Sequence, residues 1–312
     1  MLRIVFWGST DISARVFSLL LDNPDLVSVV GVITVPDKSV GRSQTLAANP
    51  VTQLAQTHSI PIIQPPKCDD SVRAFLHDIQ PDISLVVSYA KIIPADIIDI
   101  PRHKSVNVHF SLLPDLRGAS PIESALLRGF TRSGVTIMLM SAGLDEGDII
   151  SQYPFDISVD DTRRDLFDAS IKICEEHLLP DMASYVLGGI VPTTQDHSLA
   201  THVRKFTTED GLIDAQNMEA LAAHNTIRAL AENPGTYFVS EGKKYKVYMS
   251  KLASDLELPE LPAPGTLFVY SKRLFVMMKD APLELLQIQP ESKKVMDASS
   301  FINGYRHLIQ SL

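Results

Sequence analysis

Two polar residues interrupt an alternating segment just before it ends. Residues 105–118 read SVNVHFSLLPDLRG, and the alternation over 105–109 predicts a β-strand. Side chains two positions apart in a strand point to the same face, so we expect Asn107 and His109 to lie side by side. An amide donor beside an imidazole can bind a developing oxyanion and exchange a proton near neutral pH. The same pair can also close a loop structurally, and the pattern alone favours neither interpretation.

An acidic residue in a glycine-rich loop is the second candidate for chemistry. In SAGLDEGDII, residues 141–150, Gly143 and Gly147 flank Asp145, and Asp148 follows. A carboxylate held in such a loop between two strands can accept a proton. Aspartate and glycine are also ordinary turn formers, so turn formation by itself is the simpler interpretation of this segment.

The elements that must position these residues follow two patterns. Up to about residue 189, short apolar strands alternate with helically spaced segments, which predicts a largely parallel sheet covered by helices. Such sheets bind ligands at the carboxyl ends of their strands, where Asn107 and His109 fall. Residues 190–206 have little periodicity and predict a linker. One helix and several short alternating runs follow, so we expect an α/β domain over 1–189 and a small all-β domain over 207–312.

Composition limits the classes of protein to which the chain can belong. It has 312 residues, 45% of them hydrophobic, and no apolar run near the roughly 18 residues of a membrane span. We expect no signal peptide. Its two cysteines, Cys68 and Cys174, indicate neither a disulfide framework nor a zinc site and fit a reducing cytoplasm. The net charge of -9 arises in the first 200 residues, which argues weakly against bulk nucleic-acid binding.

Several common site motifs are absent from the sequence. WGSTD after the first strand is not the G-x-G-x-x-G of dinucleotide-binding folds, and there is neither a P-loop nor a G-x-S-x-G elbow. The histidines show no metal-ligand spacing. The polar loop TVPDKSVGRSQT, residues 34–45, carries Lys38 and Arg42. Its composition favours a solvated connection, and the alternative is a mobile loop that closes on an anionic partner.

Taken together, these segments resemble a known signature. NVHFSLLPDLRGASPI followed by GVTIMLMSAGLDEGD is similar to the signature of the formyltetrahydrofolate-dependent formyltransferases. RIVFWGSTD, PDISLVVSYAKIIP and FTTEDGLID match further family segments in order, so the resemblance covers essentially the whole chain. It implies a Rossmann-like formyltransferase domain followed by an OB-like barrel. It also implies that 10-formyltetrahydrofolate donates a formyl group, most closely as in the family branch that formylates the methionine of initiator tRNA for translation initiation.

The resemblance also implies the site residues. The family's catalytic trio falls on Asn107, His109 and Asp145. Asn107 and His109 would donate hydrogen bonds to the formyl oxygen, and Asp145 would hold His109 and help to move a proton. The folate-binding residues would be Ser88, Tyr89, Ala90, Ser111, Leu112, Leu113 and Pro114. The tRNA-binding residues would be Lys38 and Arg42 of a loop over 36–45, and Lys205, Lys243 and Lys244 of the barrel, with Arg204 and Lys246 beside them.

The resemblance implies no metal, no membrane and no obligate protein partner, and we expect a cytoplasmic monomer. Three other functions stay open: formylation of an amino-sugar nucleotide, an NAD-linked oxidoreductase, and a catalytically silent RNA-binding protein on the same fold. The chain departs from the usual family pattern at Ala90, Phe110, Asp115 and Glu123. Its C-terminal part, neutral where the family is usually basic, predicts a shallower salt dependence of tRNA binding.

Overall fold

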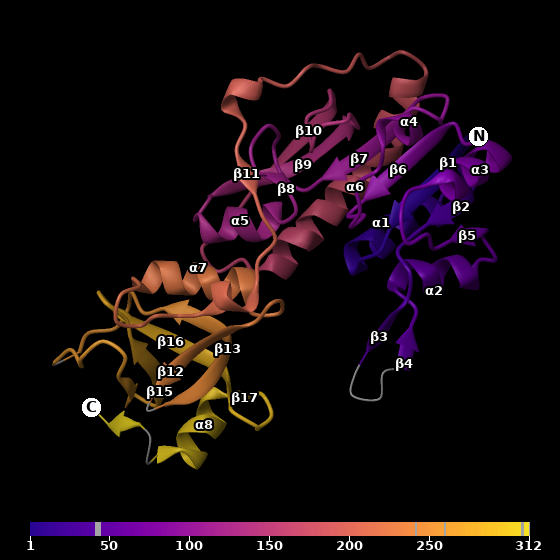
Figure 1. The fold of residues 1–312 in the computed structure, drawn as a ribbon. Helices are drawn as coiled ribbons and strands as arrows, with labels where there is room; N and C mark the ends of the chain where they lie inside the picture. The colour runs from indigo at the N-terminus through magenta and orange to yellow at the C-terminus, as the bar shows by residue number, and fades with distance from the viewer. Residues whose placement is uncertain (41–44, 241, 259, 307–308, 312) are drawn as a thin grey trace. The chain divides into compact units, whose positions relative to one another are not determined.

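The chain forms two compact units. The computed structural model describes all residues except 41–44, 241, 259, 307–308 and 312 (Figure 1). The first unit comprises Met1–Pro121, Arg132–Phe155 and Phe167–Val203. The second comprises Ile122–Thr131, Asp156–Leu166 and Arg204–Leu312. No helix within these described ranges is long and apolar enough to cross a membrane.

The first unit contains a seven-stranded sheet with the order β10–β9–β7–β6–β1–β2–β5. Neighbouring strands from β5 to β7 pair in parallel, whereas β7 and β9 pair antiparallel. The mostly parallel sheet predicted from the alternation of strands and helices is therefore confirmed. The strand bounds are β1 Leu2–Gly8, β2 Val27–Ile33, β5 Ile62–Ile63, β6 Ile83–Val87, β7 Ser105–His109, β9 Arg132–Leu139 and β10 Ile149–Asp156.

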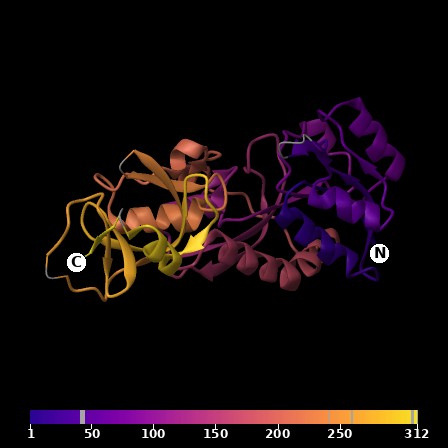
Figure 2. The ribbon, with the colours of Figure 1, turned by 90° about the horizontal axis from the view of Figure 1, so that it is seen from below.

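Helices cover both faces of this sheet. Alternate residues of β1 point to opposite faces: Val5 and Trp7 pack with Leu76 of α3, while Phe6 stacks on Phe17 of α1. Figure 2 shows the longest helix, α6, as one continuous element. The helix bounds are α1 Asp11–Leu21, α2 Pro50–Thr57, α3 Asp70–Ile79, α4 Ala95–Ile98, α5 Pro121–Leu127 and α6 Arg163–Val186.

Two short strand pairs lie outside the main sheet. β3 (Lys38–Val40) and β4 (Thr45–Ala47) form an antiparallel pair. β8 (Arg117–Gly118) pairs in parallel with β11 (His202–Val203), which follows the short 3₁₀ helix η1 (His197–Leu199). Thr193 also bridges to Ile149. The segment that looked like a linker is thus hydrogen-bonded to the first unit at two places before the second unit resumes at Arg204.

The second unit is built on a mostly antiparallel sheet with the order β12–β13–β16–β15–β14–β18, and β17 pairs with β16. Only β14 and β18 among these described pairs run parallel. The expected small β-domain is confirmed, and it also contains the helices α7 and α8 and the 3₁₀ helix η2. The bounds are η2 Thr208–Gly211, α7 Ala220–Leu230, β12 Thr236–Ser240, β13 Lys243–Leu252, β14 Leu267–Tyr270, β15 Arg273–Met277, β16 Pro282–Pro290, β17 Met296–Asp297, α8 Ala298–Gly304 and β18 Gln310–Ser311.

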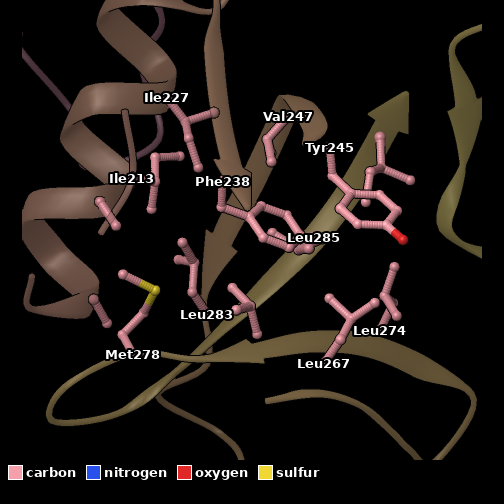
Figure 3. Close-up of a cluster of buried hydrophobic side chains, with 14 of the residues drawn as sticks. Ile213, Ile227, Phe238, Tyr245, Val247, Leu267, Leu274, Met278, Leu283 and Leu285 are labelled. Atoms are coloured by element: carbon pink, nitrogen blue, oxygen red, sulfur yellow. The ribbon is translucent and has the colours of Figure 1, made fainter. Parts of the chain in front are cut away.

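The core of the second unit lies between α7 and the sheet. Figure 3 shows Ile227 of α7 facing Phe238 of β12 and Val247 of β13. Phe238 stacks on Tyr245 with ring centroids 5.3 Å apart. Because Tyr245 and Val247 point inward, the alternation of a strand turns Lys244 and Lys246 to the outer face of β13.

Candidate active site

The candidate chemistry begins on β7, a central strand of the first sheet. Asn107 pairs with Val86 of β6 on one side and with Met138 of β9 on the other. Its main chain therefore takes part in sheet pairing on both sides, and only its side chain can contact a ligand. Asn107 is half-buried, and its amide has no hydrogen-bond partner among the described residues. A half-buried amide without a partner is available to bind a ligand.

His109, two residues later, is hydrogen-bonded at one ring nitrogen and faces a carboxylate with the other. It is 5% exposed, and its Nε2 lies 3.0 Å from the carbonyl oxygen of Leu116. A carbonyl oxygen only accepts, so Nε2 donates this hydrogen bond. Nδ1 lies 3.6 Å from Oδ2 of Asp145. Both neighbouring groups are acceptor oxygens, so the ring lies between a main-chain carbonyl and a carboxylate.

Asp145 reaches His109 from the loop between β9 and β10. Its Oδ2 accepts a hydrogen bond of 2.8 Å from the main-chain N–H of Gly118. Asp145 has a φ of 54°, in the left-handed region. A Cβ at Gly147 would lie 1.8 Å from the carbonyl oxygen of Leu139, so only glycine fits where the loop returns to β9. The spacing D-x-G-D thus has a structural reason as well as a chemical one.

The structure therefore brings two of the three expected catalytic residues together directly. His109 and Asp145 face each other, and Asn107 precedes His109 by two positions on the same strand. Two main-chain groups contact this pair: the Leu116 carbonyl oxygen accepts from His109, and the Gly118 N–H donates to Asp145. Both residues lie within the sequence motif, but a main-chain contact does not depend on residue type, so the sequence did not predict them.

The expected folate loop, Ser111–Pro114, is fixed by Thr136 of β9. The Thr136 hydroxyl donates to the Ser111 carbonyl oxygen at 2.6 Å and accepts from the Leu113 N–H at 3.1 Å. The amide of Gln152 donates both to Thr136 Oγ1 and to the Leu113 carbonyl oxygen. Leu112 packs over Gly134, where a Cβ would lie 2.4 Å from it. The loop is thus held at the end of β7 by the neighbouring strands.

Replacing Thr136 with valine is expected to lower the free energy of unfolding by about 1–3 kcal/mol, because the buried Leu113 N–H and the Ser111 carbonyl lose their partner. Urea unfolding measures this. Ser133→Ala on the same strand is the matched control. Among the described residues, Ser133 Oγ is the buried side-chain polar atom without a hydrogen-bond partner, so its removal leaves stability equal or higher. Equal losses in both variants would contradict the assignment.

The second expected folate segment, Ser88–Ala90, directly follows β6. Because β6 and β7 are parallel neighbours, this segment and the end of β7 share the carboxyl edge of the sheet. Ser88 has a φ of 47°, and Ala90 is exposed. Tyr89 lies edge-on to Trp7, and burial raises the pKa of its hydroxyl, which stays protonated. The segment therefore offers neutral polar groups and apolar surface.

The expected tRNA-binding residues are only partly described. Arg42 lies outside the described residues, and Lys38 begins β3. Lys205 and Lys243 are exposed, while Lys244 is half-buried with its Nζ 3.4 Å from the centre of the Tyr237 ring. Arg204, named beside them, is paired with Asp210 at 2.8 Å, and this pairing holds the pKa of Asp210 below its usual range. Arg204 therefore already has an anionic partner.

Three departures from the family pattern have structural partners here. Glu123 accepts from Arg163 Nε at 2.7 Å. Phe110 is buried against Phe167 in an edge-to-face pair with centroids 6.2 Å apart. Asp115 accepts from the Thr201 hydroxyl at 3.0 Å. Local packing thus accounts for these three residues without a catalytic role.

Comparisons with known proteins match both units. Residues 2–182 match the family model described as formyl transferase, and residues 205–306 match the formyl transferase C-terminal domain. The methionyl-tRNA formyltransferase of Caldicellulosiruptor saccharolyticus is 34% identical over 307 residues, covering 97% of both chains. That of Dictyoglomus thermophilum is 34% identical over 309 residues, covering 98% of this chain and 97% of the relative.

Solved structures show a similar fold at lower identity. A HypX variant from Aquifex aeolicus has a TM-score of 0.69 at 15% identity, covering 100% of this chain and 49% of that chain. The N-formyltransferase from Helicobacter canadensis, in complex with folinic acid and dTDP-3-aminofucose, has a TM-score of 0.66 at 20% identity. That match covers 93% of this chain and 100% of the other.

Proposed function

Since the chain belongs to the formyl transferase family, we propose that it transfers the formyl group of 10-formyltetrahydrofolate to the α-amine of methionine on initiator tRNA. The observation that carries the chemistry is the half-buried amide of Asn107, which has no hydrogen-bond partner in the described part of the chain and lies two residues before His109, the partner of Asp145. The choice of acceptor rests on the similarity to methionyl-tRNA formyltransferases over 97% of the chain.

The arrangement suits acyl transfer to an amine without a covalent enzyme intermediate. The folate donor, when bound between Ser88–Ala90 and Ser111–Pro114, supplies the formyl carbon that the neutral amine attacks. Asn107 donates a hydrogen bond to the formyl oxygen as negative charge develops there. Asp145 takes the proton that the amine loses and returns it to N10 as the old carbon–nitrogen bond breaks, while His109 stays beside it. Positioning of both substrates supplies much of the remaining rate enhancement.

His109 was expected to donate a second hydrogen bond to the formyl oxygen, but its ring nitrogens face other groups in this structure. Its Nε2 donates to the Leu116 carbonyl oxygen, and its Nδ1 faces Asp145. We therefore assign to His109 a positive charge near the formyl oxygen, stabilised by Asp145. Direct donation to the substrate requires exchange of the hydrogen bond to Leu116. This refines the expectation from sequence, in which both Asn107 and His109 donate to the same oxygen.

The outer face of β12 and β13 is our candidate tRNA surface. Lys244 lies over the Tyr237 ring, and Tyr237 pairs in register with Lys246, which is exposed. Tyr248 on the same strand donates to Gln289 Oε1 at 2.9 Å. Aromatic rings interleaved with lysines bind nucleic acid through phosphate contacts and base stacking. We propose that residues 207–312 hold the tRNA while residues 1–189 carry out the transfer.

Replacing both Lys244 and Lys246 with alanine is expected to weaken tRNA binding and flatten its salt dependence. Each phosphate contact adds roughly 0.7–0.9 to the slope of log affinity against log salt, so the slope should fall by about 1.4–1.8. Filter binding across a salt series measures it. Lys294→Ala, an exposed lysine in the turn after β16, is the control. An unchanged slope in the double variant would remove this face from the tRNA site.

The deciding test of the proposal is formyl transfer from 10-formyltetrahydrofolate to methionyl initiator tRNA. Methionyl elongator tRNA and an amino-sugar nucleotide are assayed in parallel, because a solved structure described as a sugar N-formyltransferase shares this fold. Transfer to the initiator tRNA alone supports the proposal. Transfer to the sugar nucleotide instead would retain the folate chemistry and overturn the acceptor.

Two unpaired cysteines, Cys68 and Cys174, agree with the proposed cytoplasmic location.

A further inference from the structure

A charged side chain is buried behind the candidate catalytic loop and has no part in the proposed chemistry. Arg117 is 2% exposed, and a buried guanidinium is tolerated only with close partners. Its Nη2 and Nε donate to Gln195 Oε1 at 2.7 and 3.2 Å. Nη2 also lies 3.0 Å from His197 Nδ1, and Nη1 lies 3.5 Å from Glu146 Oε1. Arg117 thus joins the segment 195–197 to the loop that carries Asp145.

Gln195 connects Arg117 to the main chain of the loop that carries Asp145. It is 4% exposed, and its Nε2 donates to the carbonyl oxygens of Asp145 at 2.9 Å and Gly147 at 2.7 Å. One amide group therefore accepts from Arg117 and donates to two carbonyls that flank Glu146. A glutamine side chain is suited to this task because its two ends have opposite hydrogen-bonding roles.

The same segment also fixes the main chain that touches His109 and Asp145. Thr201 Oγ1 accepts from the Leu116 N–H at 2.9 Å, and the Thr201 carbonyl accepts from the Arg117 N–H at 2.8 Å. A Cβ at Gly118 would lie 2.2 Å from the Val203 carbonyl oxygen, so β11 and β8 approach as closely as glycine permits. We call residues 195–203 the strap.

We propose that Gln195 and Arg117 are positioning residues that hold the Asp145 carboxylate against His109, an inference that rests on the proposed function. Asp145 has a φ of 54°, and such a backbone persists only where its surroundings determine it. Gln195 of the strap fixes this backbone: it accepts from Arg117 and donates to the carbonyl oxygens of Asp145 and Gly147. A displacement of about 1 Å at a reacting group costs on the order of 100-fold in rate.

The decisive variant is Gln195→Glu, which keeps the shape and the acceptor for Arg117. It replaces the donating amide with a carboxylate oxygen that faces the carbonyls of Asp145 and Gly147, so the loop is pushed away while the strap stays anchored. We expect kcat to fall about 10–100-fold, with the KM for the folate donor within roughly 3-fold of wild type. Gln195→Met, nearly isosteric and uncharged, serves as a second variant and is expected to lower kcat likewise.

One control and one substrate-free measurement separate positioning from general stability. Thr194→Ala changes the exposed neighbour of Gln195, which lies outside the strap, and is expected to keep kcat near wild type. Hydrogen exchange at the Gly118 amide, which donates to Asp145, reports the loop without any substrate. Faster exchange at Gly118 in Gln195→Glu is expected.

A kcat near wild type in both Gln195 variants would overturn the inference. So would a loss confined to KM, or unchanged exchange at Gly118. Because each variant is compared with wild type on the same acceptor, these outcomes are distinct from failure of the proposed function. That failure would show as absent transfer by the wild-type protein itself, and the exchange at Gly118 would still report whether Gln195 holds the loop.

Discussion

Replacing Asn107 with alanine is expected to lower kcat for formyl transfer about 10²–10³-fold, the usual cost of losing one oxyanion donor. Stability should stay close to wild type, because the amide is half-buried and has no hydrogen-bond partner among the described residues. The KM for the folate donor should change little, since the bond strengthens only as charge develops on the oxygen. Steady-state kinetics and urea unfolding measure the two effects separately.

Asn107→Asp tests the sign of the interaction at the same site. The side chain keeps its size, but a carboxylate replaces the donating amide and faces the developing negative charge. We therefore expect Asn107→Asp to be slower than Asn107→Ala. If the aspartate variant were the faster of the two, Asn107 would be filling space, and the donor role would be wrong.

Replacing Asp145 with asparagine is the change with the second large expected effect, a drop in kcat of about 10³-fold. The asparagine oxygen can still accept from the Gly118 N–H, which keeps the loop in place. The negative charge that faces His109 Nδ1 at 3.6 Å is lost, so the protonated ring is no longer stabilised and the proton acceptor is gone. General acid–base catalysis contributes about 10²–10⁴-fold, which sets the expected magnitude.

Glu146→Gln is the matched control for Asp145→Asn. Glu146 is the next residue of the same loop, is exposed, and lies 3.5 Å from Arg117. A glutamine oxygen can still accept from Nη1 of the buried Arg117, which also keeps its hydrogen bonds to Gln195, so kcat should change less than roughly 5-fold. Comparable losses in Glu146→Gln and Asp145→Asn would mean that the loop responds to any loss of charge, and Asp145 would have no special part in proton transfer.

The sequence predicted those helices and strands in which burial of one face makes apolar residues recur at a regular spacing. The alternation in β7 put Asn107 and His109 on one strand face, and the strand–helix alternation predicted the mostly parallel sheet. The helix α8 was not predicted. Its segment, ASSFING, is short and polar apart from Phe301 and Ile302, and Asp297 caps it in the structure. About two turns of helix with a single buried residue give too little periodicity to detect.

The two halves of the candidate site differ in how they were found. Asn107 and His109 follow from local spacing, because a strand fixes the face on which its side chains lie. Asp145 lies on a different loop, and its spacing favoured a simple turn over a proton acceptor. The family resemblance named it, and the contact with His109 comes from the way β9 and β10 place their connecting loop beside β8. Partners distant in sequence leave no periodic signal.

The sequence by itself determined the strands of the main sheet, its carboxyl edge and the residues with suitable chemistry, because apolar burial and side-chain alternation are local rules. Only the tertiary structure decided the burial and the hydrogen-bond partners of Arg117 and Gln195. Residues 190–206 resemble a linker because their polar groups have no repeating apolar face. Those polar groups are instead satisfied by another segment: Arg117, Gln195 and Thr201 exchange hydrogen bonds that become visible once β8 and β11 lie together. Hydrogen bonding between distant segments depends on the packed fold, so composition cannot report it.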